Sequence, residues 1–449
     1  MLGRVAVTRG EVGVRFPLSA DPGTGVWTTT RRGSWTGGFW AGLLWLRARH
    51  TGEAADRAAA EACTARLADW AEADTATRGL ILWYGTALAP DSAAAATLRA
   101  HAARACLGAL DPELGLVPWG SAFGGPRLLA RADAVPGLVP LLASAGPQGR
   151  AAAASHLHRH LALCVGASPR PAPAWEYAPA TGWRPLAEPA PGWSRGRAWL
   201  LLAVADALVH PDGALGDPDH LRAVARRLGA PLTGGRPAEG SVPPTPSGDD
   251  VPSGDDVATY ANPIAADVSA PSTGRLARAA RPVDHAAPGF LPVGDTAPSA
   301  PAPAAAPPLV PPADEDRPDG PLDTSAAAIT AVALLKLATL PGAESCARRA
   351  EAILHRLVGA HLSGTATGTG TSTETGTGPG GGTGSGADAG TGNGPDLDPA
   401  PGPRPAGMLL DGCHDAPTAT AVRHELIWGD FFLALGLAVL TGEVDPRDV

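Results

Sequence analysis

The chain has 449 residues, of which 44% are hydrophobic and 18% are charged, so it can bury a large core. Its formal net charge of −9 argues against nucleic acid or an anionic membrane as the main partner, because both require a dense basic surface. The start of the chain lacks the apolar block of a signal peptide, and the longest apolar runs are too short to span a bilayer. We therefore expect a soluble cytoplasmic protein that binds a small or neutral ligand.

Two tracts of biased composition interrupt the chain. Residues 231–308 are rich in proline and repeat the letters SGDD, and residues 363–404 are rich in glycine and threonine. Neither tract has apolar residues at a regular spacing, so both are predicted to be disordered inserts. The remaining segments, 1–230, 309–362 and 405–449, are predicted to form one helical domain.

Outside these tracts, apolar residues recur every three to four positions, which is the period of an amphipathic helix. Asp323 and Thr324 are cap candidates for one helix, and Pro341-Gly342 closes it. Convincing alternation of the kind that marks strands is missing, so the expected fold class is all-α. The spacing indicates antiparallel helix hairpins wound into a ring, with a funnel of loops at one end. In chain order, the helices are predicted over residues 37–49, 54–71, 93–109, 134–145, 149–165, 196–209, 218–228, 325–340, 344–358 and 425–441.

The cysteines and one histidine-rich stretch could suggest a metal site, but their spacing argues against it. The five cysteines are odd in number and lack a CxxC pair, so they are interpreted as free thiols in a reducing compartment. His156, His158 and His160 alternate in SHLHRH. On a helix these side chains point in different directions, and no acidic partner lies at a suitable spacing, so we interpret them as solvated or core histidines.

An ordered set of segments resembles the unsaturated glucuronyl hydrolases, glycoside hydrolase family 88. The resemblance extends over both ends of the chain and skips the two tracts. It implies an (α/α)6 barrel, a six-hairpin toroid. The segments are RFPLSADPGTGVWTTTRRGSWTGGFWAGLLWLRARHTG, RADAVPGLVPLL, GWSRGRAW, DTSAAAI, GCH and ELIWGDFF.

The resemblance also implies an unusual hydrolysis. Enzymes of this family act on the 4,5-unsaturated uronic acid at the end of an oligosaccharide and hydrate its C4=C5 double bond. An aspartic acid protonates C4, water adds at C5, and the resulting hemiketal opens and releases the remaining sugar. No metal or organic cofactor is implied, and the partner is a small oligosaccharide.

Five residues match family positions that carry this chemistry. The match places the proton donor at Asp133, although an aspartate there could instead cap the following helix. Arg195 and Trp199 match R-G-x-A-W, in which the arginine faces the substrate; the alternatives are a surface ion pair and a core tryptophan. Trp35 and Trp119 are predicted to be aromatic walls for the sugar, although a tryptophan is more often part of a core. Arg197 replaces a family glutamine.

The resemblance also accounts for the stretch SWTGGFWAGLLWL. Its tryptophans are five residues apart, which on a helix turns successive side chains by about 140°, so the three rings cannot share one face. Trp35 precedes the helix and is expected at the funnel rim, while Trp40 and Trp45 are expected to pack between helices. The intervening Gly37, Gly38 and Gly42 would allow close approach. The segments DTSAAAI and ELIWGDFF are interpreted as mainly structural, although Trp428 and Asp430 could approach the funnel.

One departure from the family concerns a second aspartate. The family pattern T-H-D-x-G-F, aligned on Gly79, falls on residues 75–80, which read TATRGL and lack both the histidine and the aspartate. Asp74 lies one position too early and could substitute only if the loop shifts. The leading hypothesis is a hydrolase of unsaturated glucuronyl oligosaccharides. The alternatives are a catalytically impaired sugar-binding or regulatory protein on the same barrel, and an activity like that of the unsaturated rhamnogalacturonyl hydrolases.

Overall fold

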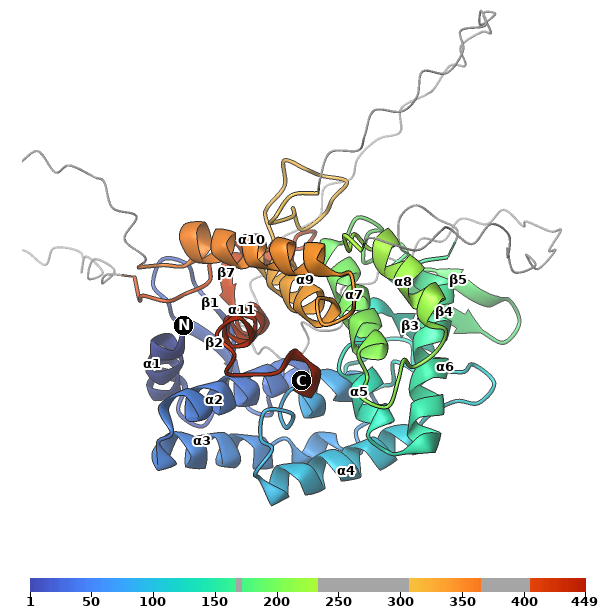
Figure 1. Cartoon of the computed structure of the whole chain (residues 1–449), viewed down its shortest axis with the longest axis horizontal. Coiled ribbons are helices and arrows are strands. Elements are labelled where there is room, and N and C mark those ends of the chain that lie inside the picture. The colour runs from blue at the N-terminus through green and yellow to red at the C-terminus, as the bar shows by residue number, and fades with distance from the viewer. Residues whose placement is uncertain (167–171, 233–306, 365–403) are drawn as a thin grey trace, which may run out of the picture.

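The computed structural model of the chain is mostly helical (Figure 1). The two predicted inserts fall outside the described residues except at their ends, so their character stays a prediction. The structure describes residues 1–166, 172–232, 307–364 and 404–449.

All ten predicted helices are present, and α1, which the spacing did not predict, precedes them. Helix α5 begins later than expected because Gly137, with a φ of 70°, interrupts the chain just before it. A π-helical turn, η3 (Gly79–Trp83), takes the place of a full helix between α3 and α4. The helices are α1 (Leu2–Val12), α2 (Gly37–Thr51), α3 (Ala54–Ala65), α4 (Ala93–Gly108), α5 (Leu138–Ala143), α6 (Pro147–Cys164), α7 (Ser194–Leu208), α8 (Pro218–Arg227), α9 (Thr324–Leu337), α10 (Glu344–His361) and α11 (Ile427–Leu440).

The helices form two concentric rings. In the inner ring, α2, η3, α5, α7, α9 and α11 each contact the next, and α11 returns to α2. The sequence explains this division, because α7, α9 and α11 are apolar on nearly all sides and are buried along almost their whole length. The outer helices α1, α3, α4, α6, α8 and α10 bury only one face. Figure 1 shows the chain running around the ring in sequence order, which is the arrangement of an (α/α)6 barrel.

Two small sheets were missed, so the all-α prediction was incomplete. One sheet has the strand order β2-β1-β7-β6 and the other β3-β4-β5, with antiparallel pairing throughout. β3 has only three residues and β1 is buried on both faces, so neither shows alternation. The strands are β1 (Phe16–Ala20), β2 (Trp27–Thr30), β3 (Leu129–Arg131), β4 (Ala174–Ala178), β5 (Gly182–Pro185), β6 (Gly412–Asp415) and β7 (Thr420–Leu426).

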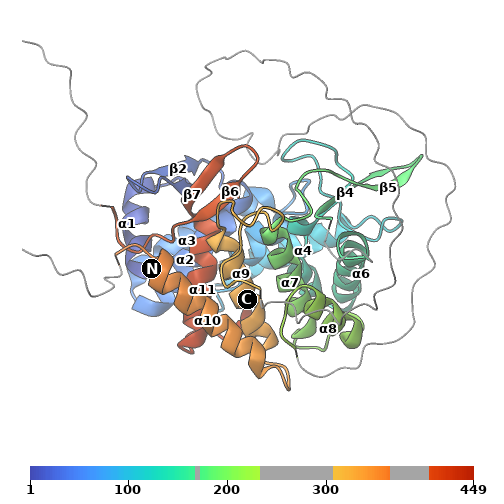
Figure 2. The same ribbon diagram turned by 90° about the horizontal axis from the view of Figure 1, so that it is seen from above.

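Every strand lies in a connection from an outer helix to the next inner helix. β1 and β2 precede α2, β3 precedes α5, β4 and β5 precede α7, and β6 and β7 precede α11. Consecutive helices of a hairpin run in opposite directions, so these connections collect at one end of the barrel. Figure 2 shows both sheets along the same edge of the helical ring. We call this end the mouth.

The tryptophans and glycines of α2 pack as predicted. Trp40 and Trp45 are buried between helices, and the Trp45 Nε1–H donates to Thr64 Oγ1 of α3 at 2.9 Å. A Cβ added at Gly38 would lie 2.3 Å from the Ile81 carbonyl oxygen, so only glycine lets α2 approach η3 so closely.

The ring closes where the beginning of the chain meets α11. Ser19 and Ala20 of β1 pair with residues of β7, and α11 packs against α2. Arg4 of α1 donates to the buried Glu425 of β7 with an Nη2–Oε2 distance of 2.8 Å. Burial and the neighbouring Glu425 carboxylate raise the pKa of Asp430, which lies beside this pair, well above its usual value.

No helix of the described part of the chain is long and apolar enough to cross a bilayer. The five cysteines are buried free thiols, as predicted.

Candidate active site

The predicted site residues other than Trp199 precede or begin inner helices, and this places them near the mouth. Within the described residues, each of the connections into α2, η3, α5, α7, α9 and α11 contributes a polar or aromatic side chain there. The contributors are Trp35, Thr75 and Thr77, Trp119 and Asp133, Arg195, Asp323, and His414 and Trp428.

Trp35 belongs to an aromatic cluster with two residues near the start of α11. Its ring centroid lies 4.8 Å from that of Trp428 and 6.2 Å from that of His414, and the last two are 5.3 Å apart. Among the described residues, the Nε1 atoms of both tryptophans and Nε2 of His414 are buried without a hydrogen-bond partner. Burial, with the nearby Arg195 charge, lowers the pKa of His414 to about 3, so this ring is neutral. The cluster therefore presents polar atoms that lack partners.

Arg195 lies beside this cluster, with its guanidinium carbon 5.6 Å from the Trp428 ring centroid. Its Nη1 donates to Asp323 Oδ2 at 2.5 Å and to the Cys413 carbonyl at 2.5 Å, and its Nη2 donates to the His414 carbonyl at 2.6 Å. The Asp323 side chain is fully buried, and it also caps α9, as predicted, by accepting from the amides of Ser325 and Ala326. Arg195 thus joins the starts of α7 and α9 to strand β6, and most of its donors are committed to protein groups.

Asp133 and Trp119 meet at a second arginine, Arg131, which the sequence reasoning did not single out. Arg131 donates from Nε to Asp133 Oδ1 and from Nη2 to Oδ2, both at 3.0 Å. The two side chains are only 6% and 7% exposed. The guanidinium carbon also lies 4.6 Å from the Trp119 ring centroid, over its face. The signal for Arg131 was present in RAD, because an arginine two residues from an aspartate is close enough to bind its carboxylate across the turn that follows β3.

Two buried histidines of α6 lie close to this ion pair. His156 accepts from the Val117 amide through Nδ1, and its Nε2 donates to the Ala134 carbonyl. Burial lowers the pKa of His160 to about 4, and its Nε2 is buried with no partner among the described residues. Both are core histidines, while His158 is exposed, so the interpretation of this stretch is confirmed.

Trp199 does not join either cluster. It is 1% exposed, and its ring packs against Phe39 and Phe432 with centroid distances of 6.2 and 5.5 Å. The structure therefore brings Trp35 together with Arg195, and Trp119 together with Asp133 through Arg131. Trp199 lies in the hydrophobic core of the barrel.

Two threonines stand where the family pattern has its first residue and its aspartate. Thr75 and Thr77 share a hydrogen bond of 2.9 Å between their hydroxyls and are buried, and the Ala76 amide donates to the Trp119 carbonyl. Asp74 instead accepts from Ser121 and Arg127 near the surface. Burial opposes these bonds, but together they lower the pKa of Asp74, so its carboxylate does not provide a proton at neutral pH.

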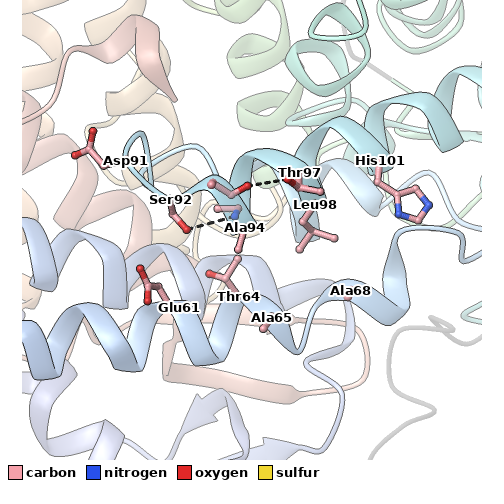
Figure 3. Close-up of a pocket in the computed structure, with 12 residues that line it drawn as sticks. Glu61, Thr64, Ala65, Ala68, Asp91, Ser92, Ala94, Thr97, Leu98 and His101 are labelled. Atoms are coloured by element: carbon pink, nitrogen blue, oxygen red, sulfur yellow. Dashed lines mark hydrogen bonds between the residues drawn. The ribbon is translucent and has the colours of Figure 1, made fainter.

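A cavity with a volume of about 710 Å³ lies between α3 and α4 (Figure 3). Its lining includes Glu61, Asp91 and His101 and none of the predicted site residues. No three His, Cys, Asp or Glu side chains of the described residues converge in a way that would hold a metal ion.

No protein-family model matches the sequence, and no curated protein matches it. Solved structures do match. A structure of UGL with dGlcA-Glc-Rha-Glc aligns with a TM-score of 0.64 and 17% identity, covering 98% of this chain and 94% of the other. The unsaturated glucuronyl hydrolase of Bacillus sp. GL1, responsible for the degradation of glycosaminoglycan, gives 0.63 and 17% over the same shares. An unsaturated glucuronyl hydrolase specific for heparin gives 0.62 and 18%, covering 99% and 96%.

These identities are low, but the alignments extend over nearly the whole of both chains, so the resemblance seen in the sequence is confirmed in the fold. The chain has the (α/α)6 barrel fold of the unsaturated glucuronyl hydrolases.

Proposed function

We propose that the protein is a glycoside hydrolase that hydrates the C4=C5 double bond of a 4,5-unsaturated uronic acid at the end of an oligosaccharide. Asp133 is the general acid that protonates C4 and the base that then accepts a proton from the water that adds at C5. The hemiketal formed at C5 opens and releases the remaining sugar. The bound sugar dGlcA-Glc-Rha-Glc of a structure with the same fold is consistent with such a substrate.

The set of unpaired polar atoms at the mouth carries this proposal. Buried donors almost always have partners in a folded protein, and a group of exceptions in one place indicates a ligand that supplies acceptors. In the described part of the chain, three such atoms lie together at the mouth, Nε1 of Trp35 and Trp428 and Nε2 of His414. Nε1 of Trp119, beside Arg131, is also unpaired, and further unpaired buried atoms lie elsewhere in the barrel. A sugar acid is rich in hydroxyl and carboxylate oxygens that can accept from indole N–H groups, while its C–H faces pack against the rings.

Asp133 has the surroundings that the reaction requires. It is 5% exposed, so bulk water does not compete for the proton that it transfers. The Arg131 guanidinium stacks on the Trp119 ring and bonds to Asp133. A sugar ring that takes its place would therefore contact the indole face next to the carboxyl group. His160 and His156 close the back of this site from α6.

A second candidate is a sugar-binding protein without turnover on the same barrel. The observation that favours it is the pair Thr75 and Thr77, whose hydroxyls bond to each other where the family pattern requires an acidic group. A threonine hydroxyl cannot carry a negative charge at neutral pH and cannot stabilise a developing cation as a carboxylate does. This candidate keeps the unpaired donors and the sugar site but lacks an efficient reaction.

The ultraviolet absorbance of the double bond tests the proposal. A lyase-generated unsaturated disaccharide should lose this absorbance in the presence of the wild-type protein. Asp133→Asn should slow the loss by about a hundredfold to ten-thousandfold, because the amide has no proton to transfer. Asp74→Asn, which alters an exposed carboxylate of a neighbouring loop, serves as the matched control and should retain activity. Persistent absorbance at high protein concentration, with calorimetric binding of the same disaccharide, would establish the second candidate instead.

A further inference from the structure

The pairing of Arg131 with Asp133 poses a question for the proposed reaction, on which this inference rests. A carboxyl group that accepts one hydrogen bond on each oxygen from a guanidinium has the geometry of the ionised form. Transfer of a proton to C4 requires the acid form. Something must therefore change at Asp133 when the substrate binds.

The substrate itself carries the group that can make this change. The carboxyl carbon of the uronic acid is bonded to C5, and C5 is bonded to C4, so a substrate with C4 against Asp133 has its carboxylate a few bond lengths away. The Arg131 guanidinium can cover that distance by rotation about its side-chain bonds. Arg195, by contrast, is already bound to Asp323 and to two backbone carbonyls.

We propose that Arg131 is a transferable counter-ion: it pairs with Asp133 in the free protein, passes to the carboxylate of the bound sugar acid, and thereby leaves Asp133 to take up the proton that the reaction uses.

The surroundings of Asp133 support proton uptake once Arg131 has moved. A buried carboxylate without a counter-ion is strongly disfavoured, and protonation removes its charge. On α6, His160 is neutral because burial lowers its pKa to about 4, and Cys164 is neutral because burial raises its pKa to about 12. Neither side chain supplies a replacement positive charge.

The other elements that pack against this segment give the same result. Arg184 of β5 pairs with Glu176 of β4, so it is not a free cation for Asp133. At the start of α7, which packs against the turn that holds Asp133, Arg195 is bound to Asp323. Helix α5, with the sequence LVPLLA, carries no charged side chain. Arg131 is thus the cation that decides the protonation state of Asp133 among the described residues around it.

The proton balance of the cycle follows directly. Binding takes one proton from solvent to Asp133, which transfers it to C4. The water that adds at C5 returns a proton to the Asp133 carboxylate, so the acid form is regenerated at each turnover. Product release lets Arg131 return, and Asp133 then gives its proton back to solvent.

The same device distinguishes acidic from neutral sugars. A neutral sugar has no carboxylate to attract Arg131, so Asp133 stays ionised and cannot protonate C4. Arg131 would therefore select for acidic substrates through the chemical step as well as through binding.

Isothermal titration calorimetry in buffers of different ionisation enthalpy measures the protons taken up on binding. The probe is a saturated disaccharide that ends in glucuronic acid, which has the carboxylate but no double bond to hydrate. At pH 7 we expect about one proton taken up per ligand by the wild-type protein. The same disaccharide with glucose in place of glucuronic acid should bind without proton uptake.

Three variants assign the proton to this pair. Asp133→Asn and Arg131→Gln should both reduce the uptake to near zero, the first because no acid is left and the second because Asp133 is no longer paired in the free protein. Arg131→Gln should also weaken binding of the acidic disaccharide about tenfold or more. Arg127→Gln, which breaks an exposed ion pair with Asp74, should keep the wild-type proton number.

The outcomes separate this inference from the proposed function. Binding of the acidic disaccharide by the wild-type protein without proton uptake would overturn the transfer of Arg131, even if the double-bond assay shows turnover. An unchanged proton number in Arg131→Gln would overturn it as well. Proton uptake without turnover would support the transfer while contradicting the hydrolase. If neither the saturated disaccharide ending in glucuronic acid nor the unsaturated disaccharide binds, both the transfer of Arg131 and the proposed function are contradicted.

Discussion

Replacing Arg195 by glutamine tests whether this residue supports the fold or the ligand. Its side chain is 5% exposed and that of Asp323 is fully buried, so the change leaves a buried carboxylate without its counter-ion. Such a loss costs about 3 to 5 kcal/mol. The lower value applies here, because Asp323 keeps hydrogen bonds from the Ser325 amide and hydroxyl.

The two carbonyls that Arg195 caps add to this cost. Cys413 and His414 each lose a charged donor, which costs about 1 kcal/mol for each group. The expected total is about 5 kcal/mol. From the usual entropy of unfolding per residue, this corresponds to a fall in melting temperature of about 5 to 8 °C for a barrel of this size.

Differential scanning calorimetry at pH 7 measures the shift, and Arg222→Gln provides the matched control. Arg222 pairs with Asp219, whose side chain is 92% exposed, so that variant should melt within about 1 °C of the wild type. A melting temperature of Arg195→Gln equally close to the wild type, together with weaker binding of an unsaturated uronide, would refute this reasoning. Arg195 would then act on the ligand, as the family resemblance implies.

Three further variants test the buried polar groups and the packing. Folding raises the pKa of Asp430, so this group supports the folded state fully below about pH 4 and progressively less as pH rises toward its pKa in the folded protein. The melting temperature of Asp430→Asn should therefore rise relative to that of the wild type between pH 5 and 8. A difference in melting temperature that stays constant over this range would contradict this. His160 has its pKa lowered to about 4, so stability falls as pH drops from about 6.5 toward that value, and His160→Leu should show a weaker fall in thermal melts over this interval. Gly38→Ala should lower the melting temperature by several degrees, because its Cβ would meet the carbonyls of η3, whereas Gly3→Ala, with open space around it, should not; equal melting of the two would disprove the close approach.

The helical framework could be predicted because its signals are local. The inner helix over residues 324–337 combines a run of apolar residues with an aspartate cap, and the cap hydrogen bonds of Asp323 form as expected. Gly38 and Gly42 are a second local signal, and they predicted close contacts of their helix with a neighbour. Glycine weakens the interior of a helix, so two glycines between large rings indicate that a neighbouring element lies too close for a Cβ.

The sheets and the ion pairs could not be predicted, because their partners are far apart in sequence. β1 pairs with β7, about four hundred positions later, and no period in either strand specifies the other. Arg195 and Asp323 are likewise distant in sequence, and they meet only when the starts of α7 and α9 come together in the barrel. Asp133 illustrates a different limit: the family match gave its position, but it did not show that Arg131, the first residue of the same matched segment, would bind both of its carboxylate oxygens.

The pairing of β1 with β7 also sets the order in which the barrel can be completed during synthesis. The faces of α2 and α9 that later bury α11 remain exposed on the nascent chain until residues 427–440 have left the ribosome. Strand β7, which pairs with β1, is synthesised just before that helix. The last inner helix and the strand pairing that closes the ring therefore become available almost together. We therefore expect ribosome-bound intermediates to be held by chaperones as open arcs of hairpins, and protease resistance to appear in a single late step.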